Sequence, residues 1–212
     1  ETLHGLENVD TFVFNAHKWL FTNFDCALFY MRDPARLASA LSLTPTYLES
    51  ESGETAEFRD WSVALGRRFR ALKLWFVLRS YGAIELRRKL RDHITWTQRL
   101  ADTIRDEGDF ELVTGPRLGL LTFRFTPAGV NEAELDRLNE LLLSRVNDSG
   151  YLYLTKTRVR GRLVIRFAIG QTYTTLDHVE QGWACVCQIA RSIERNGDTH
   201  GTSQLIQGPH PS

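Results

Sequence analysis

A lysine lies between two apolar stretches near the start of the chain. In NAHKWLFTNFDCALFYM, residues 15–31, Lys18 follows a histidine and precedes a tryptophan. Residues 10–15 and 26–31 are rich in Val, Phe and Tyr and read as two short β-strands, which places Lys18 in the turn between them. Burial of a lysine costs several kcal/mol unless its charge is paired or its amine is chemically modified. The chain must therefore expose this amine, pair its charge or modify it chemically.

Two interpretations of Lys18 follow from the residues alone. A lysine near a strand end is more often a surface residue whose stem lies along apolar neighbours while the amine stays in water. The bulky neighbours His17 and Trp19 and the two apolar strands favour the second interpretation, a desolvated amine that loses its proton more readily. A deprotonated amine is the form that attacks a carbonyl group to make an imine. The residues leave both interpretations open.

The rest of the chain alternates helical and strand patterns, as in an α/β protein. Apolar residues recur at helical spacing from Leu65 to Phe76, and Gly82 fits a C-cap, so we expect a helix over 65–82 and a second over 83–106. After residue 110, the pattern predicts a compact α+β unit with strands and helices in separate layers. Its predicted elements are strands 110–113 and 118–125, a helix over 131–144, strands 151–157 and 162–169 around a turn at Arg160-Gly161, and a helix over 176–194. Residues 196–212 are predicted to form a disordered tail.

Composition and charge argue against several classes of function. Lys plus Arg and Asp plus Glu both total 26, so the formal net charge is zero and no basic excess favours a nucleic-acid ligand. No apolar run approaches the ~18 residues that a membrane span needs. Three cysteines and no signal-peptide pattern predict a reducing, cytoplasmic location, and no His, Cys and Asp spacing suggests a metal site. His93 and His178 are expected at surface or boundary positions. The start without methionine, almost directly in a strand, predicts a fragment or a processed chain.

Five blocks of the sequence, in order, resemble one enzyme family. NAHKWLFTNFDC at residues 15–26 closely resembles the cofactor-lysine signature of the group II pyridoxal-phosphate-dependent decarboxylases, which include the aromatic L-amino acid, histidine and glutamate decarboxylases. PTYL at 45–48 resembles the mobile catalytic loop of the family, and the segment from FRDW to LRSYG at 58–82 resembles the part that follows this loop. LGLLTFRF at 118–125 and LVIRFAIG at 163–170 resemble strands of its small C-terminal domain. The resemblance is closest to the aromatic L-amino acid decarboxylases.

The resemblance implies roles for five residues. Lys18 would be the catalytic lysine that holds pyridoxal phosphate as a Schiff base, and His17 would lie beside the cofactor phosphate. Tyr47 would be the catalytic-loop tyrosine that contacts the substrate and delivers a proton to its carbon. Gly66 would leave room for a large aromatic substrate side chain, and Arg67 would bind near the cofactor end of the site.

The resemblance also implies an architecture. The chain would be the C-terminal part of a fold-type I pyridoxal-phosphate-dependent transferase, with residues 1–72 in the large cofactor domain and 73–195 as the small C-terminal α+β domain. The enzyme would be a homodimer that converts an aromatic L-amino acid to its amine and CO₂. It would require its N-terminal half, which in relatives carries a phosphate-binding turn, an aspartate for the pyridine nitrogen and a histidine stacked on the ring. The alternatives are an aromatic aldehyde synthase of the same family, which Tyr47 argues against, and a catalytically incomplete interaction fragment.

Overall fold

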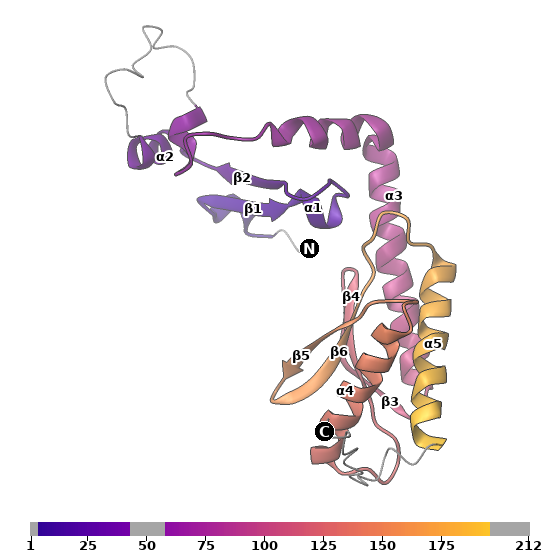
Figure 1. Cartoon of the computed structure of the whole chain (residues 1–212). Coiled ribbons are helices and arrows are strands. Elements are labelled where there is room, and N and C mark those ends of the chain that lie inside the picture. The colour runs from indigo at the N-terminus through magenta and orange to yellow at the C-terminus, as the bar shows by residue number, and fades with distance from the viewer. Residues whose placement is uncertain (1–3, 43–57, 196–212) are drawn as a thin grey trace, which may run out of the picture. The chain divides into compact units, whose positions relative to one another are not determined.

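The computed structural model describes residues 4–42 and 58–195 and divides the chain into two compact units, Glu1–Leu86 and Arg87–Ser212 (Figure 1). The loop segment with Tyr47 and the tail predicted over 196–212 lie outside the described residues. The domain boundary expected after residue 72 concerns the complete enzyme and stays a prediction.

The first unit is built around a strand–turn–strand segment. Strand β1 (Thr11–Asn15) pairs antiparallel with β2 (Ala27–Met31), and the predicted turn between them contains the short helix α1 (Ala16–Trp19). Helix α2 (Pro34–Leu41) begins after Asp33, because Asp33 Oδ1 accepts a hydrogen bond from the Ala35 N–H at 3.2 Å and a proline is tolerated at the first helical position. The remaining elements are the 3₁₀ turns η1 (Leu6–Asn8) and η3 (Phe58–Trp61), and the start of α3 (Arg70–Asp106).

Helix α3 corrects one sequence prediction and confirms another. The helix begins at Arg70 instead of Leu65, since Leu65 and Phe69 are exposed and have no core to face, and Gly66 disfavours a helix. Gly82 has φ 70° and ψ 164°, so two helical segments meet there at a kink, as the expected C-cap implies. The second segment ends at Asp106, at the predicted residue.

The second unit is the predicted α+β unit. Four antiparallel strands in the order β3-β4-β6-β5 form its sheet, and helices α4 and α5 pack together with the last part of α3 (Figure 1). Leu121, Phe123 and Phe125 alternate along β4 and are buried in the core with residues of all three helices, as the two-residue period of a strand requires. The elements are β3 (Phe110–Arg117), β4 (Leu120–Phe125), α4 (Glu132–Asp148), β5 (Thr155–Val159), β6 (Arg162–Ala168) and α5 (Leu176–Arg195).

Strand β5 starts later than the pattern predicts. The side chain of Asn147 accepts a hydrogen bond from the Leu154 N–H at 2.8 Å and donates one to the Leu154 carbonyl at 3.1 Å. Because the amide satisfies this backbone, residues 151–154 lie outside the ladder and pairing begins at Thr155. The turn at Arg160-Gly161 is confirmed, with positive φ at both residues as a type I′ hairpin needs.

His93 was expected at a surface or boundary position, and this expectation is wrong. The residue is 1% exposed on α3 and lies against Trp96, with ring centroids 5.4 Å apart. Burial lowers its pKa, and the neighbouring Lys89 charge adds to the decrease while Asp92 opposes it. His178 is exposed near the start of α5, in agreement with the sequence expectation.

Candidate active site

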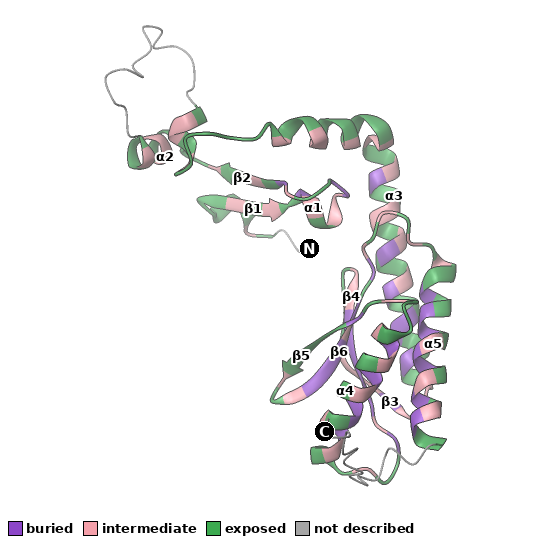
Figure 2. Ribbon diagram, in the orientation of Figure 1, coloured by how far each residue is buried: buried purple, intermediate pink, exposed green. Residues whose placement is uncertain are grey.

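The turn that carries Lys18 is the best-packed part of the first unit. Apart from Leu86, all buried described residues of this unit lie in it: Ala16, Phe21, Thr22 and Cys26. Figure 2 shows how few residues are buried there compared with the second unit. The Thr22 N–H donates to the Ala16 carbonyl at 3.2 Å, which closes the turn behind Lys18. Phe21 adopts a left-handed φ of 56°, a conformation that costs a bulky residue about 1–2 kcal/mol and that burial of its ring offsets.

His17 is held at its backbone and at its ring. Its N–H donates to the Cys26 carbonyl at 3.0 Å, and its Nδ1 lies 3.0 Å from the Cys26 amide nitrogen. The ring of Phe24 meets the imidazole edge-on, with centroids 4.8 Å apart. These contacts fix the residue directly before Lys18 in both position and orientation.

An ion pair ties the far end of the same turn to α3. Arg70 donates from Nη2 and Nε to Asp25 Oδ2 at 2.9 and 3.1 Å, and Lys73 Nζ lies 4.0 Å from Asp25 Oδ1. The hydrogen bonds from Arg70 hold the pKa of Asp25 below its usual value, against the opposing effect of desolvation. Residues 16–26 are thereby clamped to the first turn of α3, 45 residues later in the chain.

The desolvation of Lys18 that its sequence neighbours predict is not found. Lys18 is exposed, and it makes no hydrogen bond or ion pair within residues 4–42 and 58–195. Its apolar flanks do not cover it: Ala16 and Phe21 in the same turn are buried, whereas Lys18 is exposed. The amine is therefore open to a ligand, and residues of the described chain do not supply an apolar pocket around it.

Gly66 and Arg67 lie in the irregular segment between η3 and α3. Arg67 Nη1 donates to the Phe58 carbonyl at 2.9 Å, and no hydrogen bond or ion pair joins Arg67 to His17 or Lys18 in the described part of the chain. A Cβ at Gly66 would meet no described atom within 4 Å. The structure thus fixes the ring of His17 next to its sequence neighbour Lys18 and shows no contact of Arg67 with either residue. The site roles of all five residues stay predictions.

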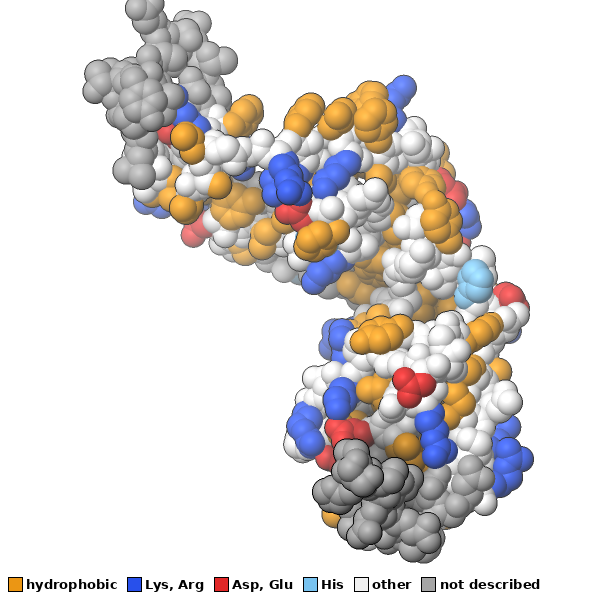
Figure 3. Space-filling model, viewed as in Figure 1, with side chains coloured by type: hydrophobic (Ala, Val, Ile, Leu, Met, Phe, Trp, Pro, Cys, Tyr) orange, Lys and Arg blue, Asp and Glu red, His pale blue; other side chains and the backbone are white. Residues whose placement is uncertain are grey.

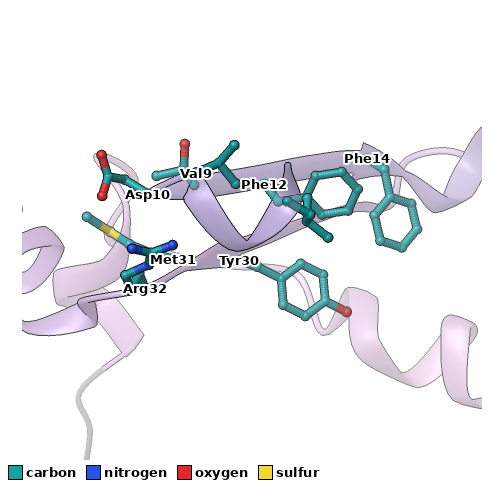
Figure 4. Close-up of a pocket in the computed structure, with 9 residues that line it drawn as sticks. Val9, Asp10, Phe12, Phe14, Tyr30, Met31 and Arg32 are labelled. Atoms are coloured by element: carbon teal, nitrogen blue, oxygen red, sulfur yellow. The ribbon is translucent and has the colours of Figure 1, made fainter. Parts of the chain in front are cut away.

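A pocket of the first unit is lined by residues other than Lys18. A hollow of about 510 Å³ lies on the β1–β2 hairpin, and Figure 4 shows Phe12, Phe14 and Tyr30 lining it. Phe14 and Tyr30 are stacked, with centroids 6.3 Å apart. The opposite side chains Val13 and Phe29 are 61% and 53% exposed, so both faces of this hairpin are apolar and open. A strand pair of this kind is typical of a sheet that is covered on both faces.

Two kinds of feature are absent from the described residues. No group of three or more His, Cys, Asp or Glu side chains there is arranged to hold a metal ion. No helix among them is long and apolar enough to cross a membrane.

The sequence matches a known family over the region that carries this site. Residues 1–126 match the pyridoxal-dependent decarboxylase conserved domain. The chain belongs to the pyridoxal-dependent decarboxylase family. Its fold is mixed α/β, and its structural neighbours are decarboxylases of fold type I, as the resemblance in the sequence implied. The matched residues include the packed turn around Lys18.

The relatives of this chain are named for two different activities, amino acid decarboxylation and aldehyde synthesis. The chain is 40% identical over 200 residues to tyrosine decarboxylase 1 of Narcissus pseudonarcissus, covering 90% of this chain and 39% of that protein. It is 38% identical over 187 residues to a phenylacetaldehyde synthase of Arabidopsis thaliana, covering 87% of this chain and 38% of that protein. A crystal structure of Oryza sativa TDC with PLP and tryptamine has a TM-score of 0.85 at 35% identity, covering 90% of this chain and 40% of that one. The chain thus spans about two fifths of the length of these relatives.

Sequence reasoning missed the residues that hold the turn. The Asp25–Arg70 ion pair joins positions 45 residues apart. The hydrogen bond from the Cys26 amide to the His17 ring joins positions 9 residues apart. No periodicity or motif links positions at such separations. A charged residue next to an otherwise apolar strand, Asp25 before β2, was the one signal that could have prompted a search for its partner.

Proposed function

We propose that this chain is the lysine-bearing part of a pyridoxal-phosphate-dependent enzyme that converts an aromatic L-amino acid to the corresponding amine and CO₂. The observation that carries the proposal is the exposed Lys18 amine beside a fixed His17, on a turn that lies within the family match. Similarity to relatives named for tyrosine decarboxylation supports the aromatic substrate class.

The residues present fit the cofactor. Lys18 offers a primary amine without a competing partner in the described chain, which is what capture of an aldehyde requires. His17 offers a ring nitrogen, Nε2, that makes no hydrogen bond to described residues and could bind an anionic group. Pyridoxal phosphate, when bound, supplies an electron sink for breaking the bond to the substrate carboxylate. Tyr47 would then give its phenolic proton to the substrate carbon that has lost CO₂.

The first test locates the cofactor on the chain. The complete protein is incubated with pyridoxal phosphate, reduced with borohydride and mapped by peptide mass spectrometry. We expect a covalent pyridoxyl group on Lys18, loss of that label in Lys18→Ala, and a fall in amine formation by several orders of magnitude. Lys156→Ala is the matched control, since Lys156 pairs with Glu140 in the second unit. A label on Lys73 or Lys89 would contradict the assignment.

An aldehyde synthase is the second candidate, because a phenylacetaldehyde synthase is among the relatives. That reaction consumes the amino acid, O₂ and water and releases aldehyde, CO₂, ammonia and hydrogen peroxide. The tyrosine at position 47 favours the amine product, since its hydroxyl can protonate the substrate carbon before O₂ reacts. Amine and peroxide are measured together under air, in wild type and Tyr47→Phe. We expect amine from wild type and peroxide from the variant; peroxide as the main wild-type product would favour the synthase.

We further propose that the active protein needs the portion that corresponds to the N-terminal half of its relatives, and that it is a homodimer. Open apolar side chains support a covering partner, since Phe24, Val63, Phe69 and Ile84 are 84%, 93%, 74% and 84% exposed. Figure 3 shows hydrophobic side chains gathered over the first unit in this view. Cofactor absorbance of the chain with and without that portion separates an enzyme part from an interaction fragment that never binds cofactor.

A cytoplasmic location is also proposed. The three cysteines Cys26, Cys185 and Cys187 are unpaired thiols, which supports a reducing compartment. Imaging of the complete protein with a fluorescent fusion tests it.

A further inference from the structure

The ring of His17 faces both polar groups of one backbone residue. Its Nδ1 lies 2.9 Å from the carbonyl oxygen of Cys26 and 3.0 Å from its amide nitrogen. In a neutral imidazole one nitrogen carries the proton and donates, and the other accepts. The proton on Nδ1 would serve the carbonyl, and the proton on Nε2 would leave Nδ1 free to accept from the amide.

The amide decides between these two forms. The Cys26 carbonyl already accepts the main-chain N–H of His17 at 3.0 Å. Within the described residues the Cys26 N–H has no acceptor other than His17 Nδ1, and Cys26 is 3% exposed. A proton on Nδ1 would point one donor at another and leave a buried N–H unsatisfied. With the proton on Nε2, the Cys26 amide donates to Nδ1 and the Cys26 carbonyl keeps the main-chain N–H of His17 as its donor, while Nδ1 and the carbonyl oxygen, 2.9 Å apart, meet as two acceptors. The cost of that contact is smaller than that of a buried N–H without an acceptor, because the carbonyl already has a donor.

We propose that the backbone of Cys26 locks His17 in the Nε2–H tautomer, so that the ring presents one oriented, uncharged N–H donor next to Lys18. A donor of this kind binds an anionic oxygen without adding a second positive charge beside the amine. That the oxygen belongs to the phosphate of pyridoxal phosphate rests on the proposed function, whereas the tautomer itself does not.

The residue before Cys26 connects the backbone that contacts the His17 ring to α3. Asp25 is fixed by the Arg70 guanidinium at 2.9 and 3.1 Å, and Cys26 Sγ lies 3.9 Å from the Arg70 carbonyl. The amide that holds the His17 ring is the peptide group between Asp25 and Cys26. Asp25 and Arg70 are therefore positioning residues, which act on His17 through the orientation of this peptide.

The tautomer is tested by nitrogen NMR of the 212-residue chain with ¹⁵N-labelled histidine side chains. The His17 signals are assigned as those lost in His17→Asn among the six histidines. Near neutral pH we expect the His17 pattern of a protonated Nε2 and an accepting Nδ1. A pattern with the proton on Nδ1, or an average of both forms, overturns the proposal whatever the enzyme activity.

The positioning role has its own spectroscopic test. Asp25→Ala removes the carboxylate that Arg70 holds, and we expect its His17 signals to move toward the average of the two tautomers. The control is Asp33→Ala, which removes a carboxylate of the same unit that caps α2. Unchanged His17 signals in Asp25→Ala would show that the ion pair does not act on the ring.

A pair of variants separates the two nitrogens in the complete protein. Asparagine at 17 places an acceptor near the Nδ1 position but no donor near Nε2, and glutamine places a donor near Nε2. We expect His17→Asn to weaken binding of pyridoxal phosphate about tenfold to hundredfold, as loss of one hydrogen bond to a charged group implies. Binding of pyridoxal, which lacks the phosphate, should change little, and His17→Gln should keep most of the phosphate preference.

The control for these affinities is His4→Asn, the same change at an exposed histidine of the same unit. Equal losses for pyridoxal and pyridoxal phosphate in His17→Asn would overturn the assignment of Nε2 as the anion donor. If wild type binds neither compound, the proposed function fails, and the NMR result still decides the tautomer.

Discussion

The ion pair between the buried Arg124 and Asp136 gives a prediction about stability. Removal of the more exposed residue, Asp136, should lower the free energy of unfolding more than removal of Arg124. Arg124 is 0% exposed on β4 and forms ion pairs with Glu132 and with Asp136, the latter at 2.6 Å. Asp136 also accepts from the Leu163 N–H at 3.0 Å and from Arg158 at 2.8 Å. The two carboxylate side chains are 59% and 29% exposed, so water reaches them but not the guanidinium.

The free energies of unfolding of two variants should therefore differ. Asp136→Ala leaves the buried Arg124 charge with one solvent-exposed partner and the Leu163 N–H with no acceptor. Breaking a buried pair in this way costs about 3–5 kcal/mol, and we expect about 3 kcal/mol because Glu132 remains. Arg124→Met removes the buried charge and keeps most of the volume, while water solvates both carboxylates. We expect that change to cost about 1 kcal/mol.

The free energy of unfolding of both variants is measured by urea unfolding of the chain, followed by circular dichroism. Hydrogen exchange of the β4 and β6 amides reports on the second unit separately. Asp148→Ala is the control, because Asp148 is exposed and accepts a 3.2 Å hydrogen bond from the Ser144 hydroxyl; its cost should stay within about 0.5 kcal/mol. A cost for Arg124→Met equal to or above that of Asp136→Ala would refute the reasoning.

The same network predicts an acid dependence. Burial would raise the pKa of Asp136, but the Leu163 N–H, Arg158 and the Arg124 charge together hold it below its usual value. A lowered pKa in the folded state means that the stabilisation is present above the unfolded value, about 3.9, and is lost as pH falls through the folded value. Wild type should lose this contribution below about pH 4, and Asp136→Ala should not.

Three further predictions concern the second unit. Gly161→Ala should cost about 1–2 kcal/mol in urea unfolding because Gly161 has φ 81°, whereas Gly108→Ala, at a glycine without positive φ, should not. Burial, with Glu107 nearby, raises the pKa of the Cys187 thiol to about 12, so iodoacetamide at pH 8 should spare it in the folded chain; rapid alkylation would contradict this burial. Because burial lowers the pKa of His93, the unfolded state binds the proton more readily, and stability should fall as pH drops through about 6.5. His93→Gln should flatten that dependence, and an equal slope in this variant would assign it to another group.

The sequence by itself determined the local elements. The strands around Lys18, the alternation of Leu121, Phe123 and Phe125, and the turn at Arg160-Gly161 follow from side-chain period and turn chemistry, which act over a few residues. The order of these elements was enough to predict the α+β unit. The candidate site residues came from local strings of residues as well: His17 and Lys18 from residues 15–26, Tyr47 from 45–48, and Gly66 and Arg67 from 58–82.

The tertiary structure decided what those elements do to individual side chains. It left Lys18 exposed, buried His93, shortened β5 through the Asn147 side chain, and joined Asp25 to Arg70. Each outcome depends on contacts between residues that are distant in the chain or on which face of an element meets the core. Periodicity states that a face is apolar, but only packing determines whether another element covers it, and so the charge, exposure and tautomer of a site residue are set in three dimensions.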